Sequence, residues 1–371
     1  MTEILKTIEL IEDKRQEKKV RHKLLDIVVI VLFAKLANAD DWEEVEIFAK
    51  SNEEFLRQYI GLENGIPSHD TMQRVMGSIA PEYMQGVYNK WHELVNSNEG
   101  ETLKKIICID GKTMRGNQSN GQKANHIVSA WCDMDGFCLG QKKVEEKSNE
   151  ITAIPQLLDA IQIKGSVITV DAMGTQTEIV EKIKQKHADY TLAVKENQKN
   201  LYREISEYFE DVELLKEIKC NNGYRITKEK SHSQIETREY YQCSKIGWMQ
   251  EKSRWKGIKS IGMICKTTEQ SGKQVTRRYY ISSLPLNVEL FARTVREHWS
   301  VEVMHWHLDV TFKEDANTTL DKTAAQNLNI INKWCLSILK LFDVGKKLSL
   351  RKKRYCISMN ARKYLEQILS L

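Results

Sequence analysis

The spacing of hydrophobic and polar residues changes along the chain, and each change predicts a different kind of structure. Residues 1–95 carry few turn signals except in the stretch 62–70, and they predict a helical region. Short β-branched runs then alternate with amphipathic stretches from residue 104 onward, which indicates strands alternating with helices. Residues 200–285 are rich in Thr, Ser, Tyr and Lys and predict a β-rich insertion. From residue 287 the helical spacing returns.

The part that begins at residue 104 predicts a sheet. Apolar runs at 106–110 and 166–171 predict buried strands, and residues 189–195 predict another. Two short strands within 126–144 are separated by an Asp-Gly pair, which is typical of a hairpin turn. Helices are expected between these strands. The order indicates an α/β fold whose mixed sheet is flanked by helices.

Composition narrows the class of protein. A length of 371 residues exceeds what one hydrophobic core usually holds, and it predicts two or three lobes. The net charge of +5 is too small to predict binding to a polyanion by itself. The eight cysteines are scattered without a C-x-x-C pair. This pattern argues against a zinc knuckle and a disulfide scaffold, and it favours reduced thiols in a cytoplasmic protein.

Nothing in the sequence predicts a membrane partner. The N-terminal residues are charged throughout and do not form a signal peptide. The most apolar stretch, 24–39, is too short to span a bilayer and contains Asp26 and Lys35. We expect it to be a buried helix. The motifs of zincins, P-loop proteins, serine hydrolases and dinucleotide-binding proteins do not occur in the sequence.

Two carboxylates follow the apolar strands. Asp110 comes at the end of the run 106–109, and Asp171 comes at the end of the run 167–170. Ligands of α/β sheets bind outside the carboxyl ends of the strands, so neighbouring strands would bring these carboxylates together. Two such anions raise each other's pKa or bind a cation, and Mg²⁺ prefers oxygen ligands of this kind. Either aspartate alone is better explained as a turn residue or a helix N-cap, whereas the pair favours a site.

A third acid occurs in a predicted helix near residue 302. Polar and aromatic side chains share one helical face there, with Glu302 at its centre: His298, Glu302, His305, Trp306 and Asp309. A stripe of this composition is most often part of a core. A glutamate buried in such a stripe is costly, however, unless it is paired or bound to a metal ion.

Motifs with consistent order and spacing connect these segments to a known family. They include "NGIPSHDTMQRV", "IDGKTMRG", "LGQKKVEEKSNEITAIPQLL", "TVDAMGTQ", "DYTLAVKENQ" and "REHWSVEVMHWHLDVTFKEDA". Over nearly its whole length the chain resembles the ISAs1-family transposases, also called H-repeat-associated proteins, of the DDE group.

The resemblance implies a ribonuclease-H-like core whose three acids, Asp110, Asp171 and Glu302, are both the catalytic residues and the metal ligands. It implies two Mg²⁺ or Mn²⁺ ions, which support phosphodiester hydrolysis and strand transfer at the ends of an insertion sequence. Expected partners are double-stranded DNA, as terminal inverted repeats and target, and further copies of the chain. We expect a cytoplasmic protein that is associated with the nucleoid when it binds DNA.

The expected domain organisation combines the resemblance with the pattern of the chain. The expected parts are an N-terminal helical domain (1–98), the first part of the core (102–200), a mainly β insertion (201–285), the second part of the core with the Glu helix (286–342) and a basic C-terminal helical tail (343–371).

The sequence departs from related families around Glu302. Where those families carry Tyr, Arg and Lys, this chain has Val295, His298 and Asp309. Arg296, His298 and Lys313 are candidates to replace the missing cations. The residue after the glutamate is Val303, where this family usually has Asn. That Asn is equally well explained as a support for the metal ligands or as a helix-surface residue.

Basic residues predict contacts to DNA phosphates. The clearest run lies in 345–364, and others lie near the core. The candidates are Lys195, Arg238, Arg296, His298, Lys346, Lys347, Arg351, Lys352, Lys353 and Arg354. The alternative for the C-terminal run is a solvated helix face. Trp299 and Trp306 are expected to pack in the core, with stacking on a DNA base as the alternative.

Two other functions remain open. The chain can be a catalytically silent or domesticated DNA-binding protein that still recognises ends, or a metal-dependent nuclease without transposition. The presence of all three acids favours the transposase, and inverted repeats beside the gene would separate it from both rivals.

Overall fold

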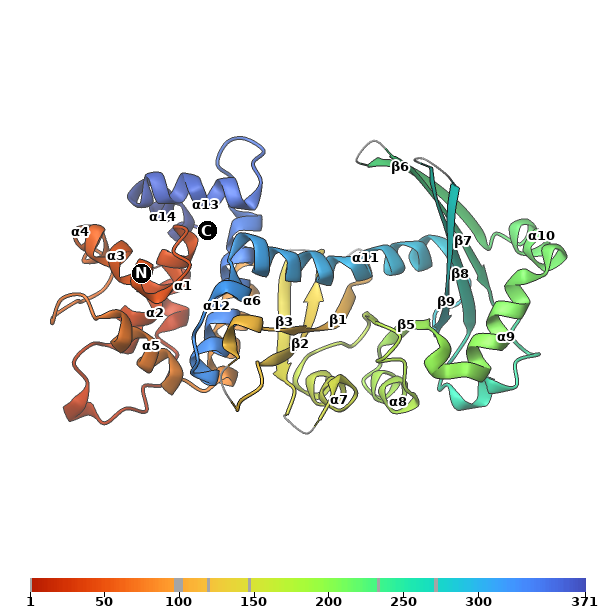
Figure 1. Ribbon diagram of the computed structural model, residues 1–371, viewed down its shortest axis with the longest axis horizontal. Coiled ribbons are helices and arrows are strands. Elements are labelled where there is room, and N and C mark those ends of the chain that lie inside the picture. Colours follow the sequence, from red (N-terminus) through yellow and green to blue (C-terminus); the bar gives the residue numbers. More distant parts are fainter. Residues whose placement is uncertain (1, 97–102, 119–120, 146–147, 232–233, 270–272) are drawn as a thin grey trace.

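The computed structural model describes residues 2–96, 103–118, 121–145, 148–231, 234–269 and 273–371. Figure 1 shows an elongated molecule, with helices at one end, a sheet in the middle and a second group of strands at the other end. One long helix, α11 (Val288–Trp306), runs across the middle and connects the two ends. In the described part of the chain, no helix is long and apolar enough to cross a membrane.

The predicted N-terminal helical region is confirmed. It contains α1 (Glu3–Ile8), α2 (Leu24–Leu36), α3 (Trp42–Ser51), α4 (Glu53–Leu56), α5 (His69–Ser78) and α6 (Pro81–Val95). The side chain of Ser68 accepts a hydrogen bond from the Thr71 N–H, so it caps α5 as its position before the helix predicts. The predicted buried helix is α2, which is covered almost completely on all sides.

The polar residues of α2 have specific partners. The Asp26 carboxylate accepts hydrogen bonds from the backbone N–H groups of Gly61 (3.3 Å) and Leu62 (3.2 Å). The Lys35 ammonium donates to the carbonyl of Asp40 (3.2 Å). Burial, and next the nearby charge of Arg354, lower the pKa of Lys35 to about 8. This buried ammonium therefore makes folding depend on pH.

Raising the pH from about 8 to about 10.4 is expected to increase the contribution of Lys35 to the free energy of unfolding. The unfolded chain holds the lysine proton more tightly than the folded chain, so folding releases it in this window, with a gain of at most roughly 3 kcal/mol. Lys35→Met removes this dependence. Urea unfolding of the wild type and Lys35→Met at pH 7.5 and pH 10 tests the expectation: the free energy of unfolding of the wild type relative to the variant should be higher at pH 10. An equal difference at both pH values would contradict it.

The C-terminal helices join the N-terminal ones in one bundle. They are α12 (Lys322–Leu341), α13 (Leu350–Met359) and α14 (Ala361–Leu369). Helix α12 is buried between α2, α5 and α6, and the phenol of Tyr88 lies 2.6 Å from the Ser337 hydroxyl across this contact. A single hydrophobic core extends from α1 to α14 and includes Cys108 and Trp131 of the sheet. The bundle therefore packs against one face of the sheet.

The predicted mixed sheet is confirmed. Its first strands are β1 (Ile106–Thr113), β2 (His126–Cys132), β3 (Phe137–Lys143), β4 (Val167–Val170) and β5 (Asp189–Val194). Strands β1, β4 and β5 run parallel, whereas β1–β2 and β2–β3 are antiparallel pairs. Helices α7 (Glu150–Ala160) and α8 (Thr177–Gln185) cover the face opposite the bundle, over a separate apolar core.

One expectation for this sheet is wrong in detail. Strand β1 does not end at Asp110 but continues to Thr113. The pairing with β2 continues through this extension, because Gly111, Lys112 and Thr113 all have partners in β2. Asp110 therefore lies inside a strand that is hydrogen-bonded beyond it, so its backbone is held more firmly than at a strand end.

The β-rich insertion is confirmed, and it extends the core sheet. It contains α9 (Lys199–Glu210), α10 (Val212–Cys220), β6 (Tyr224–Ser231), β7 (Gln234–Cys243), β8 (Ser260–Glu269) and β9 (Lys273–Ser282). Strand β9 pairs with β5, so the described strands form a nine-stranded sheet in the order β3-β2-β1-β4-β5-β9-β8-β7-β6. Asp211 lies between α9 and α10, and its side chain caps α10.

Contact between β8 and α11 fixes the insertion relative to the long helix. Gly262 of β8 faces the buried ring of Phe291, and a Cβ added to Gly262 would overlap that ring. Gly262→Ala is therefore expected to lower the free energy of unfolding by about 1–3 kcal/mol. Chemical denaturation measures this loss, with Gly247→Ala as control because a Cβ there meets no atom within 4 Å. Equal stability of the two variants would contradict the expectation.

Candidate active site

Asp110 and Asp171 lie side by side at one edge of the sheet. Strands β1 and β4 are parallel, and their register pairs Ile109 with Val170. Asp110 follows Ile109 within β1, and Asp171 follows Val170 directly after the end of β4, so the two aspartates occupy neighbouring positions. This is the juxtaposition that the two apolar runs predict if their strands are neighbours.

Helix α11 brings Glu302 to the same edge. The helix packs on both β1 and β4. One turn before Glu302, the His298 ring lies 3.3 Å from the Thr169 hydroxyl of β4. One turn after it, His305 Nδ1 lies 3.5 Å from a carboxylate oxygen of Asp110. Glu302 lies between these two histidines on the helix and is exposed to solvent, so it is not buried in an aromatic stripe.

The electrostatics of the three acids connect them. Burial, and next the charge of Asp110, raise the pKa of Glu302. Burial likewise raises the pKa of Asp171, and the charge of Asp110 adds to that rise. The N–H of Gly174, which lies 3.0 Å from Asp171, acts in the opposite direction. Burial, and to a smaller extent the charge of Asp110, therefore disfavour ionisation of Asp171 and Glu302, and a bound cation would favour it.

The donor chemistry fits a hard divalent ion. Three carboxylates from β1, β4 and α11 supply the oxygen ligands that Mg²⁺ and Mn²⁺ prefer. In the ranges that the structure describes, no three Asp, Glu, His or Cys side chains are close enough together to hold an ion. The residues that could hold a metal are therefore placed at one edge of the sheet but do not converge on one point in the protein alone.

Asp309 belongs to a different cluster from Glu302. After α11 the chain forms a π-helical turn, His307–Thr311, which directs Asp309 toward β1. The Lys112 ammonium lies 2.7 Å from Asp309, 3.2 Å from Glu314 and 3.1 Å from Asp315. The expectation that Asp309 shares the face of Glu302 is therefore wrong, since uniform helical spacing does not continue through the turn.

The two tryptophans of α11 are not core residues. Trp299 is 38% exposed and Trp306 is 54% exposed, so the expectation that they pack in the core is wrong. Val303 is 53% exposed. Val303, the residue after Glu302, therefore lies on the helix surface. This favours the explanation that the family's usual Asn at this position is a helix-surface residue over the explanation that it supports the metal ligands.

The candidates for the missing cations lie in different surroundings. Lys313 pairs with Asp40 (2.8 Å), whose carboxylate also contacts Arg354, so it is held in the helical bundle. His298 is directed at Thr169, and burial lowers its pKa. Arg296 is half exposed and lies 3.3 Å from Glu229 of the insertion.

Sequence reasoning missed Arg278. This exposed residue of β9 lowers the pKa of both Glu302 and His298 by its charge. No sequence signal identifies it, because its position depends on the pairing of β9 with β5 more than 80 residues earlier in the chain. The pair formed by His126 and Glu150 (2.7 Å), which lies against Gly111, was missed as well.

The remaining residues predicted to contact DNA are either exposed to solvent or paired within the protein. Lys195 follows β5 at the same sheet edge as the acids and is exposed. Of the DNA-contact candidates in the C-terminal run, those exposed to solvent are Lys346, Lys347, Arg351 and Lys352. Arg238 is mostly buried and pairs with Glu229 and Glu236 of the insertion.

Two residues of the C-terminal run stabilise the fold. Arg354 is 0% exposed, and its guanidinium donates to the carbonyls of Lys35 (3.0 Å) and Thr311. The Lys353 ammonium donates to the carbonyls of Leu339 (2.7 Å) and Phe342 at the end of α12. The burial of Arg354 therefore does not support the prediction that it contacts DNA. The ammonium of Lys353 already donates to backbone carbonyls of the protein, which does not support a DNA contact either.

Comparison with known proteins identifies the family. Residues 5–92 match the family described as "DDE_Tnp_1-associated", and residues 101–338 match the family described as "Transposase DDE domain". The chain is 38% identical over 99% of its length to "Putative transposase YncI" of Escherichia coli O157:H7, covering 94% of that protein. It is 37% identical over its full length to "H repeat-associated putative transposase YhhI" of Escherichia coli (strain K12), covering 98% of that protein.

A shorter relative carries a different name. "Inactive transposase YbfQ" of Escherichia coli (strain K12) is 41% identical over 76 residues, which are 20% of this chain and 90% of that protein. The domain match agrees with the mixed α/β sheet. The chain therefore belongs to the DDE transposase family, whose catalytic domain has a ribonuclease-H-like fold, and within it to the H-repeat-associated group.

Proposed function

We propose that this protein cuts DNA at the ends of an insertion sequence and joins the freed strand to target DNA, by metal-dependent phosphodiester hydrolysis and strand transfer. One observation carries the proposal. Asp110 within β1 and Asp171 directly after the parallel neighbour β4 occupy adjacent positions, and Glu302 lies on the helix that packs on both strands. Rigid elements hold ligands more accurately than loops do.

Asp110, Asp171 and Glu302 would hold two Mg²⁺ or Mn²⁺ ions. Bound ions of this kind activate the attacking hydroxyl and stabilise the leaving oxygen in an in-line displacement. The chain's own residues orient the ligands. The Gly174 N–H holds one oxygen of Asp171, and His305 lies beside the carboxylate of Asp110. These neighbours limit the rotation of both carboxylates before DNA arrives.

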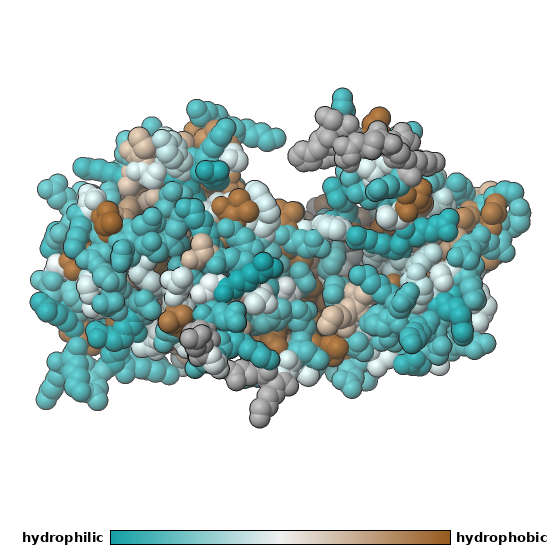
Figure 2. Space-filling model, viewed as in Figure 1, coloured by the Kyte–Doolittle hydropathy of each residue, from teal (hydrophilic) through white to brown (hydrophobic). Residues whose placement is uncertain are grey.

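The shape of the molecule leaves room for DNA at this site. Figure 2 shows the surface hollowed between the C-terminal helices and the insertion, along the edge where α11 runs in Figure 1. The loop between α12 and α13 rises at the rim of this hollow (Figure 1) and contains Lys346 and Lys347. We propose that double-stranded DNA lies in the hollow, with phosphates on these lysines, on Arg351 and Lys352, and on Lys195 near the acids.

Transposition handles two ends of one element, so we propose that the protein acts as a homodimer or a larger homo-oligomer on terminal inverted repeats. Each copy then supplies one set of three acids.

A plasmid that carries the gene with its native flanks tests the proposal. Purified protein with Mg²⁺ or Mn²⁺ is expected to cut at the flanks, to leave 3′-hydroxyl ends and to join them to a second DNA. Cutting at the flanks without joining of the ends to a second DNA would indicate a nuclease that does not transpose. Binding of the flanks without cutting in either metal would overturn the enzymatic proposal and leave a silent DNA-binding protein. The latter is the second candidate, because the acids do not converge on a metal position in the protein alone.

A further inference from the structure

Helix α11 and the π-helical turn after it lie along strand β1 in one register. Three contacts join the two elements, and both chains advance in the same direction from one contact to the next. They are Cys108 with the carbonyl of Glu297 (3.2 Å), Asp110 with His305 (3.5 Å) and Lys112 with Asp309 (2.7 Å). Alternate residues of a strand point to the same face, so the three residues of β1 all face the helix.

The spacing of two of these contacts shows why the register matters. Asp110 and Lys112 lie about 7 Å apart along the strand. His305 and Asp309 lie about 6 Å apart along the helix, so one alignment satisfies both pairs. A slip of α11 by one residue would shift Glu302 by about 1.5 Å and rotate its side chain by about 100°. Since metal ligands must be held to within about 0.5 Å, the register decides whether Glu302 reaches an ion that Asp110 binds.

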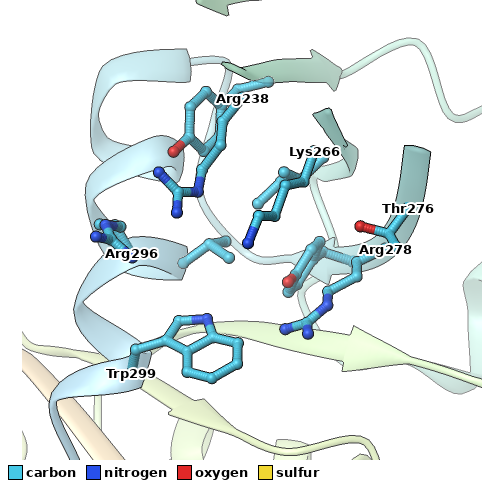
Figure 3. A pocket seen from close by; sticks show the side chains of 10 residues that line it. Arg238, Lys266, Thr276, Arg278, Arg296 and Trp299 are labelled. Atoms are coloured by element: carbon cyan, nitrogen blue, oxygen red, sulfur yellow. The ribbon is translucent and has the colours of Figure 1, made fainter. Parts of the chain in front are cut away.

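The insertion leaves open space beside the middle of α11. It packs against the first part of the helix, where Phe291 faces Gly262. Further along, Arg296 and Trp299 border a cavity of about 250 Å³ between the helix and the insertion, as Figure 3 shows. The turn that precedes Glu302 is therefore not closely packed on this side. The second half of the helix depends on its contacts to the core sheet.

Lys112 is the most firmly anchored member of the three contacts. It is 9% exposed, and its ammonium also lies 3.2 Å from Glu314 and 3.1 Å from Asp315. Glu314 is 3% exposed and accepts a hydrogen bond from Asn329 of α12 (2.8 Å). The lysine is therefore fixed to the helical bundle as well as to β1. The other two contacts are weaker, because one uses a thiol donor and the other is 3.5 Å long.

We propose that Lys112 is a positioning residue of the candidate active site: its ion pair with Asp309 fixes α11 along β1 and so holds Glu302 close to Asp110. The acids of the described chain do not converge by themselves, so the register sets how far Glu302 must move to reach a shared ion. The role of the acids as metal ligands rests on the proposed function, whereas the register rests on the contacts alone.

Hydrogen–deuterium exchange of the full-length protein, without metal or DNA, measures the register directly. Asp309→Ala removes the link to the helix and leaves Lys112 paired with Glu314 and Asp315, so the fold should persist. Amide exchange in residues 299–309 is expected to rise about tenfold or more, because the end of the helix opens more often. Lys112→Arg keeps the charge, and its exchange should stay closer to that of the wild type than the exchange of Asp309→Ala does.

Glu46→Ala is the matched control. This carboxylate also has two partners, Lys50 (2.6 Å) and His69 (2.7 Å), but it lies on α3 in the helical bundle. Its loss should leave exchange in residues 299–309 unchanged. Wild-type exchange of these amides in Asp309→Ala would overturn the proposal. An equal rise in Glu46→Ala would overturn it as well, because the effect would then reflect stability in general.

The affinity for Mn²⁺ separates positioning from stability. Titration calorimetry with Mn²⁺ alone is expected to show binding to Asp309→Ala about tenfold or more weaker than to the wild type and Glu46→Ala. Glu302→Gln removes a ligand and identifies the site in the same assay. A loss in Glu302→Gln with unchanged affinity in Asp309→Ala would overturn the positioning role. No effect of Glu302→Gln, or no binding, would instead count against the proposed metal site, and the exchange in residues 299–309 would decide the positioning role.

Discussion

Replacement of Asp171 by Asn is expected to reduce DNA cleavage at the element ends by at least about 10³-fold. The amide keeps the side-chain oxygen that accepts the hydrogen bond from Gly174 (3.0 Å), so local structure should persist. It loses the negative charge that a metal ion requires. Nicking of the flanked plasmid in Mg²⁺ measures the loss, and a gel-shift assay with the same DNA shows whether binding remains.

Asp159→Asn is the matched control for this substitution. Asp159 lies on α7 with a largely exposed side chain and pairs with Lys182, so its change should leave cleavage within about twofold of the wild type. Cleavage by Asp171→Asn at the wild-type rate would show that Asp171 is not part of the active site. A parallel loss of binding and of thermal stability would indicate a folding defect instead.

Arg354→Met is expected to lower the free energy of unfolding by about 3–5 kcal/mol. The guanidinium is fully buried and contacts the backbone carbonyls of Lys35 (3.0 Å), Ala39 (3.4 Å) and Thr311. It also pairs with Asp40 (3.3 Å). A methionine fills part of the volume but leaves these acceptors without a donor, which costs more than the lost packing.

The contrast with a neighbouring lysine makes this test specific. Lys352 is exposed on the same helix, so Lys352→Met should change stability by about 0.5 kcal/mol or less. It should instead weaken DNA binding at low salt. Urea unfolding of both variants gives the stability, and binding at two salt concentrations gives the DNA contribution. Equal stability of Arg354→Met and the wild type would show that the buried guanidinium is not needed for the fold.

The acids of the sheet could be predicted because local pattern and position agree. Asp110 and Asp171 follow runs of Ile and Val, which form buried strands almost wherever they occur. The sequence pattern left open whether their strands are neighbours, the family resemblance implied it, and the structure shows the parallel pair of β1 and β4. The same pattern placed the end of the first strand three residues early, because Gly111 and Lys112 resemble a turn until the partner strand is known.

The surroundings of Glu302 could not be predicted in the same way. Arg278 approaches this acid only because β9 pairs with β5, a contact between residues far apart in sequence. The exposure of Trp299 also depends on this pairing, because Trp299 lines a cavity between α11 and strands β7, β8 and β9 of the insertion. Composition alone assigns large aromatic residues to a core.

The C-terminal basic run shows how charge patterns mislead. Consecutive lysines and arginines predict a solvated or DNA-binding surface, and Lys346, Lys347, Arg351 and Lys352 are indeed exposed. Arg354 has the same chemistry but follows the helical period onto the face that packs against α2. A charged residue on that face is tolerated because helix ends there leave backbone carbonyls that need a donor.

The measurement that tests the central claim most directly is cleavage of the flanked plasmid by Asp171→Cys in two metals. A thiolate binds Mg²⁺ poorly and Mn²⁺ better, because Mn²⁺ is the softer ion. If Asp171 is a metal ligand beside Asp110 and Glu302, the variant should fail to cut in Mg²⁺ and recover cutting in Mn²⁺. Cutting in Mg²⁺ at the wild-type rate would contradict the account, because residue 171 would then hold no metal.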